Sequence, residues 1–186
     1  MENYMLILLI PLILIIIGIW FIKTSNRFNR YKVIIKESKK NVDIALAKRY
    51  DTICEMIKVA KSFANYEKTT FSDITKLRQT SNLKESNNTL KHQNQTIDKI
   101  YALAEAYPDL KSSQEFLQLQ DEINDENEQL AAAKRIVNNN ISIFNQEIVS
   151  FPRSLVAHLK GMKEMDFFKE EDLDRKKSIH SFNYDL

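Results

Sequence analysis

The N-terminal segment restricts the fold of this chain more than any other feature. Residues 5–22 read MLILLIPLILIIIGIWFI and contain no charged side chain over 18 positions. A membrane-spanning helix needs about 20 such residues, and Pro and Gly are tolerated inside one. Trp20 lies near the end of the run, where an aromatic ring would sit at headgroup level. We therefore expect residues 1–24 to form a transmembrane anchor.

A cleaved signal peptide is the alternative interpretation of this segment. Such a peptide begins with basic residues and ends with small residues at its cleavage point. Here Glu2 precedes the apolar run, and the run ends in Trp20-Phe21-Ile22-Lys23. Both features fit a signal peptide poorly, so the sequence favours an uncleaved anchor.

The charges after the anchor predict its orientation. Residues 23–40 contain seven Lys or Arg residues and one Glu, whereas the N-terminal flank has no comparable excess. The positive-inside rule therefore places the N-terminus outside and the C-terminal part in the cytoplasm. The stretch 23–40 could also bind anionic lipid headgroups, at roughly 1 kcal/mol per cation. The sequence leaves open whether it binds lipid or only sets the topology.

Composition excludes several classes of protein. The chain has only 2 Gly and 3 Pro, which argues against nucleotide-binding α/β folds with Gly-rich loops and against turn-rich all-β folds. Its net charge of +2, from 27 basic and 25 acidic residues, is too balanced for a generic nucleic-acid binder. One Cys excludes an internal disulfide framework and a multi-cysteine zinc site.

The remaining residues show helical periodicity. The anchor helix is expected to continue into the body and to break near Asp51, an N-cap residue followed by a possible Thr52/Glu55 capping box. A second helix is expected over 53–77. The stretch 78–96 is polar, and part of it is expected to be an exposed connection. A third helix over 97–107 should end at Pro108, because the residue before a proline avoids the helical region.

A fourth helix is predicted over 113–151 by apolar residues at seven-residue intervals. This period indicates left-handed, coiled-coil-like packing. Glu126 and Asn140 occupy positions that should be apolar, so we expect the helices to splay apart there, with a register role for Asn140 as the alternative. The series consists of Phe116, Ile123, Leu130, Val137, Phe144 and Phe151.

These elements predict an all-α protein. An N-terminal transmembrane helix is followed by an antiparallel up-and-down four-helix bundle with long helices, which occupies residues 25–168. Residues 153–168 should form a short amphipathic tail that folds back onto the bundle. Residues 169–186 are charged, and we expect a flexible tail there.

No catalytic, cofactor-binding or metal-binding residue emerges from the sequence. A di-metal carboxylate site in a helical bundle needs Glu-x-x-His pairs, but Thr89, Leu155 and Lys177 stand three positions before the three histidines. A His-Glu-x-x-His motif is also missing. Cys54 lies on or beside an apolar stripe and is interpreted as a core residue.

An acidic run without basic members marks the first half of the predicted fourth helix. Carboxylates near a helix N-terminus are favoured by the helix dipole, so a solvated helix face is the preferred interpretation. The alternative is a site for a basic partner or a cation. The run consists of Glu115, Asp121, Glu122, Asp125, Glu126 and Glu128.

Several short segments resemble the LemA proteins of bacteria. Residues 46–53, LAKRYDTI, are similar to the family's Leu-x-x-Arg-Arg-x-Asp-Leu-Ile segment, and residues 61–67, KSFANYE, to its Lys-Gly-Tyr-Ala-x-His-Glu. Residues 107–111, YPDLK, and the pattern of residues 116–123 match directly. Further similarities are Asn26-Arg27-Phe28, Asn138, Phe144-Asn145, Phe151-Pro152, Leu155-Val156-Ala157, Gly161-Met162 and Phe167-Phe168.

The resemblance extends over nearly all of residues 4–168. It implies a single-pass membrane protein with a cytoplasmic helical bundle and no established enzymatic activity. The chain departs from the family pattern where Cys54 replaces a Pro, Ser62 replaces a Gly, and Arg153 and His158 stand where Gly is common. These departures argue against a sharp kink near residue 54.

The functional hypothesis is a membrane-anchored cytoplasmic helical scaffold or interaction protein, without catalytic activity, at the bacterial cell membrane. Its expected contacts are lipid around residues 5–22 and a protein partner that the sequence does not identify; no nucleic acid is expected. A homo-oligomer remains an open alternative. The alternative function is a regulatory or accessory subunit of a membrane enzyme such as a protease or transporter.

Overall fold

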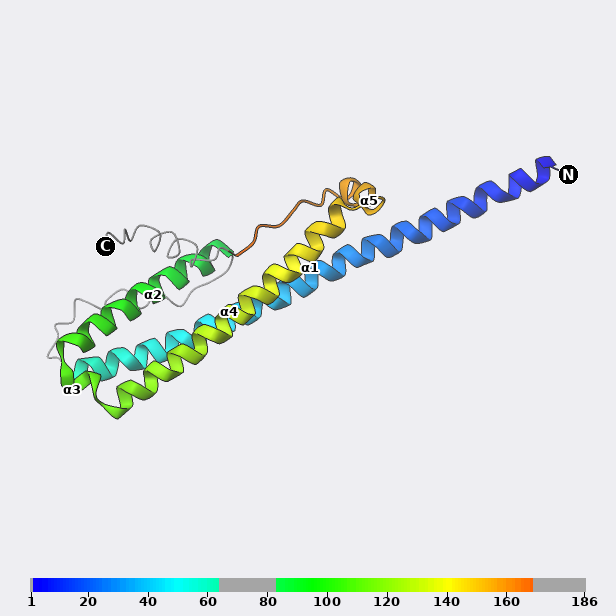
Figure 1. The fold of residues 1–186 in the computed structure, drawn as a ribbon. Coiled ribbons are helices and arrows are strands. Elements are labelled where there is room, and N and C mark those ends of the chain that lie inside the picture. Colours follow the sequence, from blue (N-terminus) through cyan, green and yellow to red (C-terminus); the bar gives the residue numbers. More distant parts are fainter. Residues whose placement is uncertain (1, 64–82, 169–186) are drawn as a thin grey trace, which may run out of the picture. The chain divides into compact units, whose positions relative to one another are not determined.

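A computed structural model describes residues 2–63 and 83–168, and every regular element in these two ranges is a helix. The all-α fold class is confirmed. The expected flexible tail at 169–186 lies outside the described residues. The elements are α1 Glu2–Phe63, α2 Leu83–Ala106, α3 Pro108–Lys111, α4 Gln114–Val149 and α5 Arg153–Leu159 (Figure 1).

Helix α1 is one uninterrupted helix of 62 residues. The anchor helix thus continues into the body as expected, but the predicted break near Asp51 is wrong. The sequence has no Pro or Gly between Gly18 and Pro108, so nothing in this part of α1 disrupts the backbone hydrogen bonds. The Thr52 hydroxyl donates to the Glu126 carboxylate instead of capping a new helix.

The part of α1 from Leu9 onward is long and apolar enough to cross a membrane. Its large apolar side chains from Leu9 to Ile19 are exposed, as is Ile22. A core helix of a soluble protein would bury these side chains. This exposure agrees with the expected anchor.

The chain forms two compact units. The first contains Met1–Val42 and Ala132–Asp166, and the second contains Asp43–Ala131 and Phe167–Leu186. Helices α1 and α4 therefore each contribute a segment to both units.

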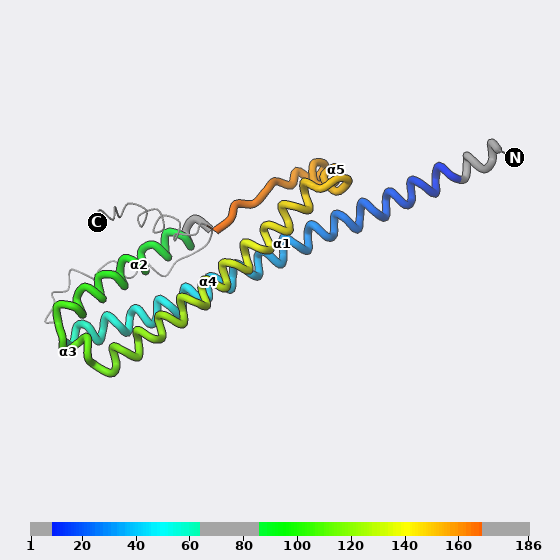
Figure 2. The backbone as a smooth tube through the Cα atoms, viewed as in Figure 1, coloured from blue at the N-terminus to red at the C-terminus, as the bar shows by residue number. Residues whose placement is uncertain are grey.

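In the first unit, α1 and α4 lie side by side and run in opposite directions (Figure 2). The rings of Phe28 and Phe144 are fully buried and meet edge to face, with centroids 6.5 Å apart. This geometry is favoured because the positive ring edge meets the negative ring face. The other buried aliphatic residues of this unit include Ile35, Val42, Val137, Ile141, Ile148 and Val156.

Helix α5 ends in a motif that requires glycine. Gly161 has φ +60°, the left-handed region that residues with a Cβ rarely adopt. The Gly161 N–H donates to the His158 carbonyl, and the Met162 N–H donates to the Ala157 carbonyl. These two bonds form a Schellman motif, which satisfies the last carbonyl groups of the helix.

The segment after α5 returns along α4. The Asn145 amide donates to the Met165 carbonyl and accepts from the Met165 N–H, both at 2.9 Å. The expected fold-back of the tail is therefore confirmed for this segment.

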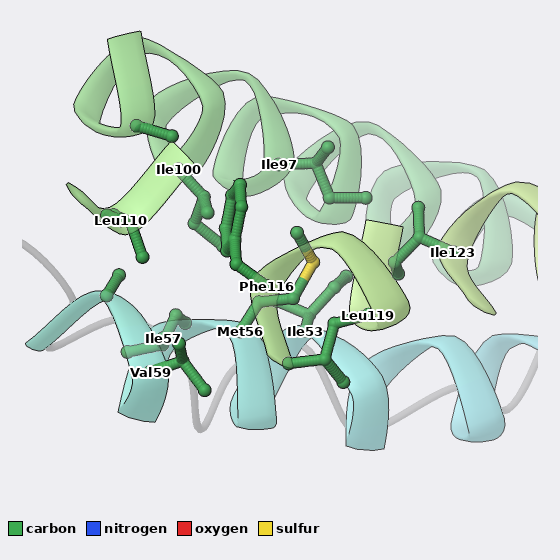
Figure 3. Close-up of a cluster of buried hydrophobic side chains, with 12 residues drawn as sticks. Ile53, Met56, Ile57, Val59, Ile97, Ile100, Leu110, Phe116, Leu119 and Ile123 are labelled. Carbon is green, nitrogen blue, oxygen red and sulfur yellow. The ribbon is translucent and has the colours of Figure 1, made fainter. Parts of the chain in front are cut away.

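In the second unit, segments of α1, α2, α3 and α4 surround an apolar core (Figure 3). Helix α2 runs in the same direction as α1, because Asp43 pairs with Ser86 and Arg49 pairs with Gln93 and Asn94. Helix α4 runs opposite to α1. The core consists of Ile53, Met56, Ile57, Val59, Ala60, Ile97, Ile100, Ala104, Leu110, Phe116, Leu119 and Ile123.

An exposed connection was expected in part of residues 78–96, but the part from residue 83 onward belongs to α2. The rest of this stretch lies outside the described residues. Leu90, Gln93 and Ile97 face the unit's interior, so a few buried contacts stabilise a helix that looks polar in sequence. The third predicted helix is the second half of α2, which ends before Pro108 as expected. Residues 64–77 of the predicted second helix lie outside the described residues.

The seven-residue series of α4 is buried at every position up to Phe144. Its last member, Phe151, is 81% exposed, which contradicts its assignment to the core series. Helix α4 ends at Val149 and Phe151 lies in the turn before α5, so the helical phase that buries the other members is lost there.

Candidate functional site

An open, acidic pocket of about 450 Å³ lies in the second unit between α1 and α4. Five of its eight lining side chains are carboxylates, and one is a lysine. The lining residues are Lys48, Asp51, Thr52, Glu55, Glu122, Asp125, Glu126 and Gln129.

Helical spacing brings these side chains together. The α1 residues 48, 51, 52 and 55 and the α4 residues 122, 125, 126 and 129 follow the same i, i+3, i+4, i+7 pattern. Residues at this spacing share one helix face. Each helix thus places one polar stripe beside the apolar stripe that enters the core.

Glu126 differs from the other carboxylates because it is only 7% exposed. Its Oε1 accepts a hydrogen bond from the Thr52 hydroxyl at 3.0 Å, while its Oε2 is buried without a hydrogen-bond partner. Burial raises the pKa of Glu126, and the negative charge of Glu122 raises it further, against the opposing effect of the Thr52 hydrogen bond.

The sequence predicted that the helices would separate at Glu126 and that the acidic run would be solvated. The pocket does lie beside Glu126, but the side chain itself is buried. The other five carboxylates of the run are exposed. The solvated-face interpretation therefore holds for those five and is wrong for Glu126.

A buried polar cluster joins α1 to α2 near the pocket. Arg49 is buried, and its guanidinium donates to Gln93 Oε1 at 3.2 Å and to Asn94 Oδ1 at 2.6 Å. Gln93 in turn donates to the Leu46 carbonyl at 3.0 Å. Arg49 was not among the residues predicted to form a site, although its three- and four-residue spacing from Leu46 and Ile53 places it on the apolar stripe.

The arrangement of the pocket carboxylates suits an extended cationic side chain. In the ranges 2–63 and 83–168, no group of three or more His, Cys, Asp or Glu side chains is placed to hold a metal ion. The pocket carboxylates are instead distributed along two helices. Such an arrangement suits a lysine or arginine side chain, whose charge can be met by several carboxylates in turn.

Comparison with known proteins assigns the chain to a family. The LemA family model matches residues 38–182, which is well over half of the chain. The chain belongs to the LemA family. A curated relative, Protein LemA of Metamycoplasma hominis, is 25% identical over 179 residues, which cover 94% of this chain and 82% of that relative.

Membership of the LemA family makes this a helical, membrane-associated protein. The segment 46–53, one of those that carry the resemblance, supplies both Arg49 of the buried cluster and Thr52, the partner of Glu126. In this LemA-family chain Cys54 is half-buried beside that segment, and α1 passes through it without a break.

Proposed function

We propose that this LemA-family protein is a membrane-anchored helical scaffold, without catalytic activity of its own, which holds a protein partner at the inner face of a bacterial cell membrane. The observation that carries the proposal is the continuity of α1, which joins the apolar segment to the folded residues in one helix. A continuous helix gives the body a fixed connection to the membrane, whereas a loop would allow it to move independently.

The orientation follows from the charges beside the anchor. Seven basic residues and one acidic residue lie between positions 23 and 40, immediately after the apolar segment. Basic residues near the end of a span stay on the cytoplasmic side. The two compact units are therefore cytoplasmic in this proposal.

The acidic pocket is the proposed contact for the partner. The exposed carboxylates of the pocket would by themselves bind a basic side chain only weakly, because an exposed ion pair contributes only about 0–1 kcal/mol. Glu126 adds a buried carboxylate oxygen without a hydrogen-bond partner, and a buried polar group in this state costs about 1–3 kcal/mol. A lysine or arginine side chain of the partner that reaches Oε2 would remove this cost.

Capture of the partner from detergent-solubilised membranes tests the proposal. The full chain is compared with a variant that carries Glu55→Gln, Glu122→Gln and Asp125→Asn, all at exposed pocket positions. The control carries Glu115→Gln, Asp121→Asn and Glu128→Gln, which remove the same charge from exposed positions outside the pocket lining.

The proposal expects one partner that the control retains and the pocket variant loses. Equal retention by both variants would contradict the role of the pocket. A single stoichiometric membrane enzyme as the partner would replace the scaffold with the accessory-subunit function, and recovery of the chain with itself alone would indicate a homo-oligomer.

A further inference from the structure

The turn before α5 and α5 itself expose an apolar face. Leu155 and Leu159 lie one turn apart on α5 and are 56% and 75% exposed, and Phe151 in the turn before α5 is 81% exposed. The opposite side of α5 buries Val156 and Ala157. Exposed apolar side chains that are grouped on one element and its flanking turn indicate an interaction surface more strongly than scattered ones do.

This face lies close to the end of the apolar segment of α1. The Lys160 ammonium at the end of α5 donates to the Ser25 hydroxyl of α1. Ser25 stands three residues after Ile22, the last residue of the apolar run, which is about 4.5 Å along a helix. The headgroup layer on each side of a bilayer is about 5–8 Å thick. Ser25 is therefore at headgroup depth if α1 is perpendicular to the membrane.

The burial pattern of α1 changes at the same point. Ile22 is exposed, but Thr24 and Ser25 are buried. The folded residues of the first unit thus begin to cover α1 two residues after the apolar run ends.

The charges around α5 also suit a lipid surface. Lys23 of α1 and Lys160 are exposed, and Arg153 begins α5. Arg27 and Arg153 share the carboxylate of Glu147, which fixes α5 next to α1. Cations beside an apolar helix face are the pattern of helices that lie in the interface of anionic membranes.

We propose that α5 lies in the membrane interface and inserts Phe151, Leu155 and Leu159 among the lipids of the leaflet from which α1 emerges. The proposal rests on the anchoring function proposed above. Three side chains suffice because α1 already holds α5 at the surface, so that insertion is an intramolecular event with a high effective concentration. The result is a second attachment point, which limits tilting of the body relative to the membrane.

Depth-dependent quenching tests the proposal in the full chain, reconstituted into vesicles of phosphatidylcholine and phosphatidylglycerol. Trp20 is the only tryptophan, so the wild-type chain reports on the anchor. In a Trp20→Phe background, Phe151→Trp and Leu159→Trp report on the α5 face. Ile136→Trp is the matched control, an exposed apolar position on α4 of the same unit.

Lipids brominated on the acyl chain should quench Phe151→Trp and Leu159→Trp about as strongly as Trp20, and Ile136→Trp much less. Absence of quenching at both α5 positions, with Trp20 still quenched, would overturn the proposal. A blue-shifted but unquenched emission would overturn it as well, because protein, such as a second copy of the chain, would then cover the face. Absence of quenching at Trp20 itself would instead overturn the anchor.

Discussion

Burial separates two phenylalanines that are equivalent in sequence. Phe144 and Phe151 belong to the same seven-residue series, yet Phe144 is fully buried against Phe28 whereas Phe151 is exposed. We expect Phe144→Ala to lower the free energy of unfolding by about 3–5 kcal/mol, through lost burial and the cavity that remains. Phe151→Ala should leave it nearly unchanged.

Thermal melting of the full chain in detergent micelles measures both variants. The melting temperature should fall by many degrees for Phe144→Ala only. Equal effects of the two substitutions would show that the series does not distinguish core from surface in this way.

The raised pKa of Glu126 makes stability depend on pH. Because the folded state favours the protonated carboxyl, this group contributes stability that is fully present below the ordinary Glu pKa of about 4.3 and is lost as the pH rises through its raised value. Glu126→Gln removes the buried charge and should therefore stabilise the chain at pH 7, on the order of 1 kcal/mol. The gain should disappear toward pH 4.

Melting curves between pH 4 and pH 8 test this expectation, with Glu128→Gln as the control because Glu128 is exposed and lies outside the pocket lining. If Glu126→Gln melted at a lower temperature than the wild type at pH 7, this would contradict the raised pKa of Glu126. It would mean that the carboxylate is ionised and satisfied in the folded chain.

The sequence predicted individual side chains well where periodicity alone determines burial. Five members of the α4 series are buried as expected. It failed at Phe151, because the exposure of this ring depends on where α4 ends, which the spacing does not contain. Glu126 and Arg49 do stand at positions that the spacing assigns to the buried side. Their burial depends on polar partners on other helices, which the spacing of one helix does not show.

At the scale of elements, long apolar segments were easier to predict than boundaries. The predicted helix at 113–151 corresponds to α4 at Gln114–Val149, because Pro152 limits its extent and its period is sustained. The break near Asp51 was wrong because a capping pattern inside a longer helix competes with intact backbone hydrogen bonds. The beginning of α2 was missed because its first turns are polar and are stabilised by contacts with α1, such as the one between Ser86 and Asp43.

The end of α5 yields a prediction at this scale. Gly161→Ala should destabilise the chain by about 1 kcal/mol, because alanine in the left-handed region is strained by that amount or somewhat more. Space does not limit the substitution, since no atom lies within 4 Å of the added Cβ. Gly161→Asn should cost less, as asparagine tolerates this conformation.

Hydrogen exchange of the α5 amides is the measurement for this pair of variants. Faster exchange in Gly161→Ala than in Gly161→Asn is expected. Identical exchange in the two variants would show that strain at a positive φ is not the reason for the destabilisation.

At the scale of the whole molecule, α1 is the central element, because it carries the apolar segment and part of both compact units. Its uncharged run and its continuation into the folded residues could be predicted from the sequence, and so could the all-α class. Its extent to Phe63 could not, because a break was expected near Asp51. The pocket could not be predicted, because it depends on two helices whose polar stripes are about 70 residues apart in the chain. A basic partner, which the sequence offered only as the alternative for the acidic run, is proposed because of this pocket.

The most direct test of the account is the location of the C-terminal part of the chain. Alkaline phosphatase, which is active only outside the cytoplasm, and a green fluorescent protein that is fluorescent in the cytoplasm are each fused after Leu186 of the full chain in a bacterial host. The account predicts a fluorescent fusion in the membrane fraction and an inactive phosphatase. An active phosphatase with a dark fluorescent fusion would contradict it.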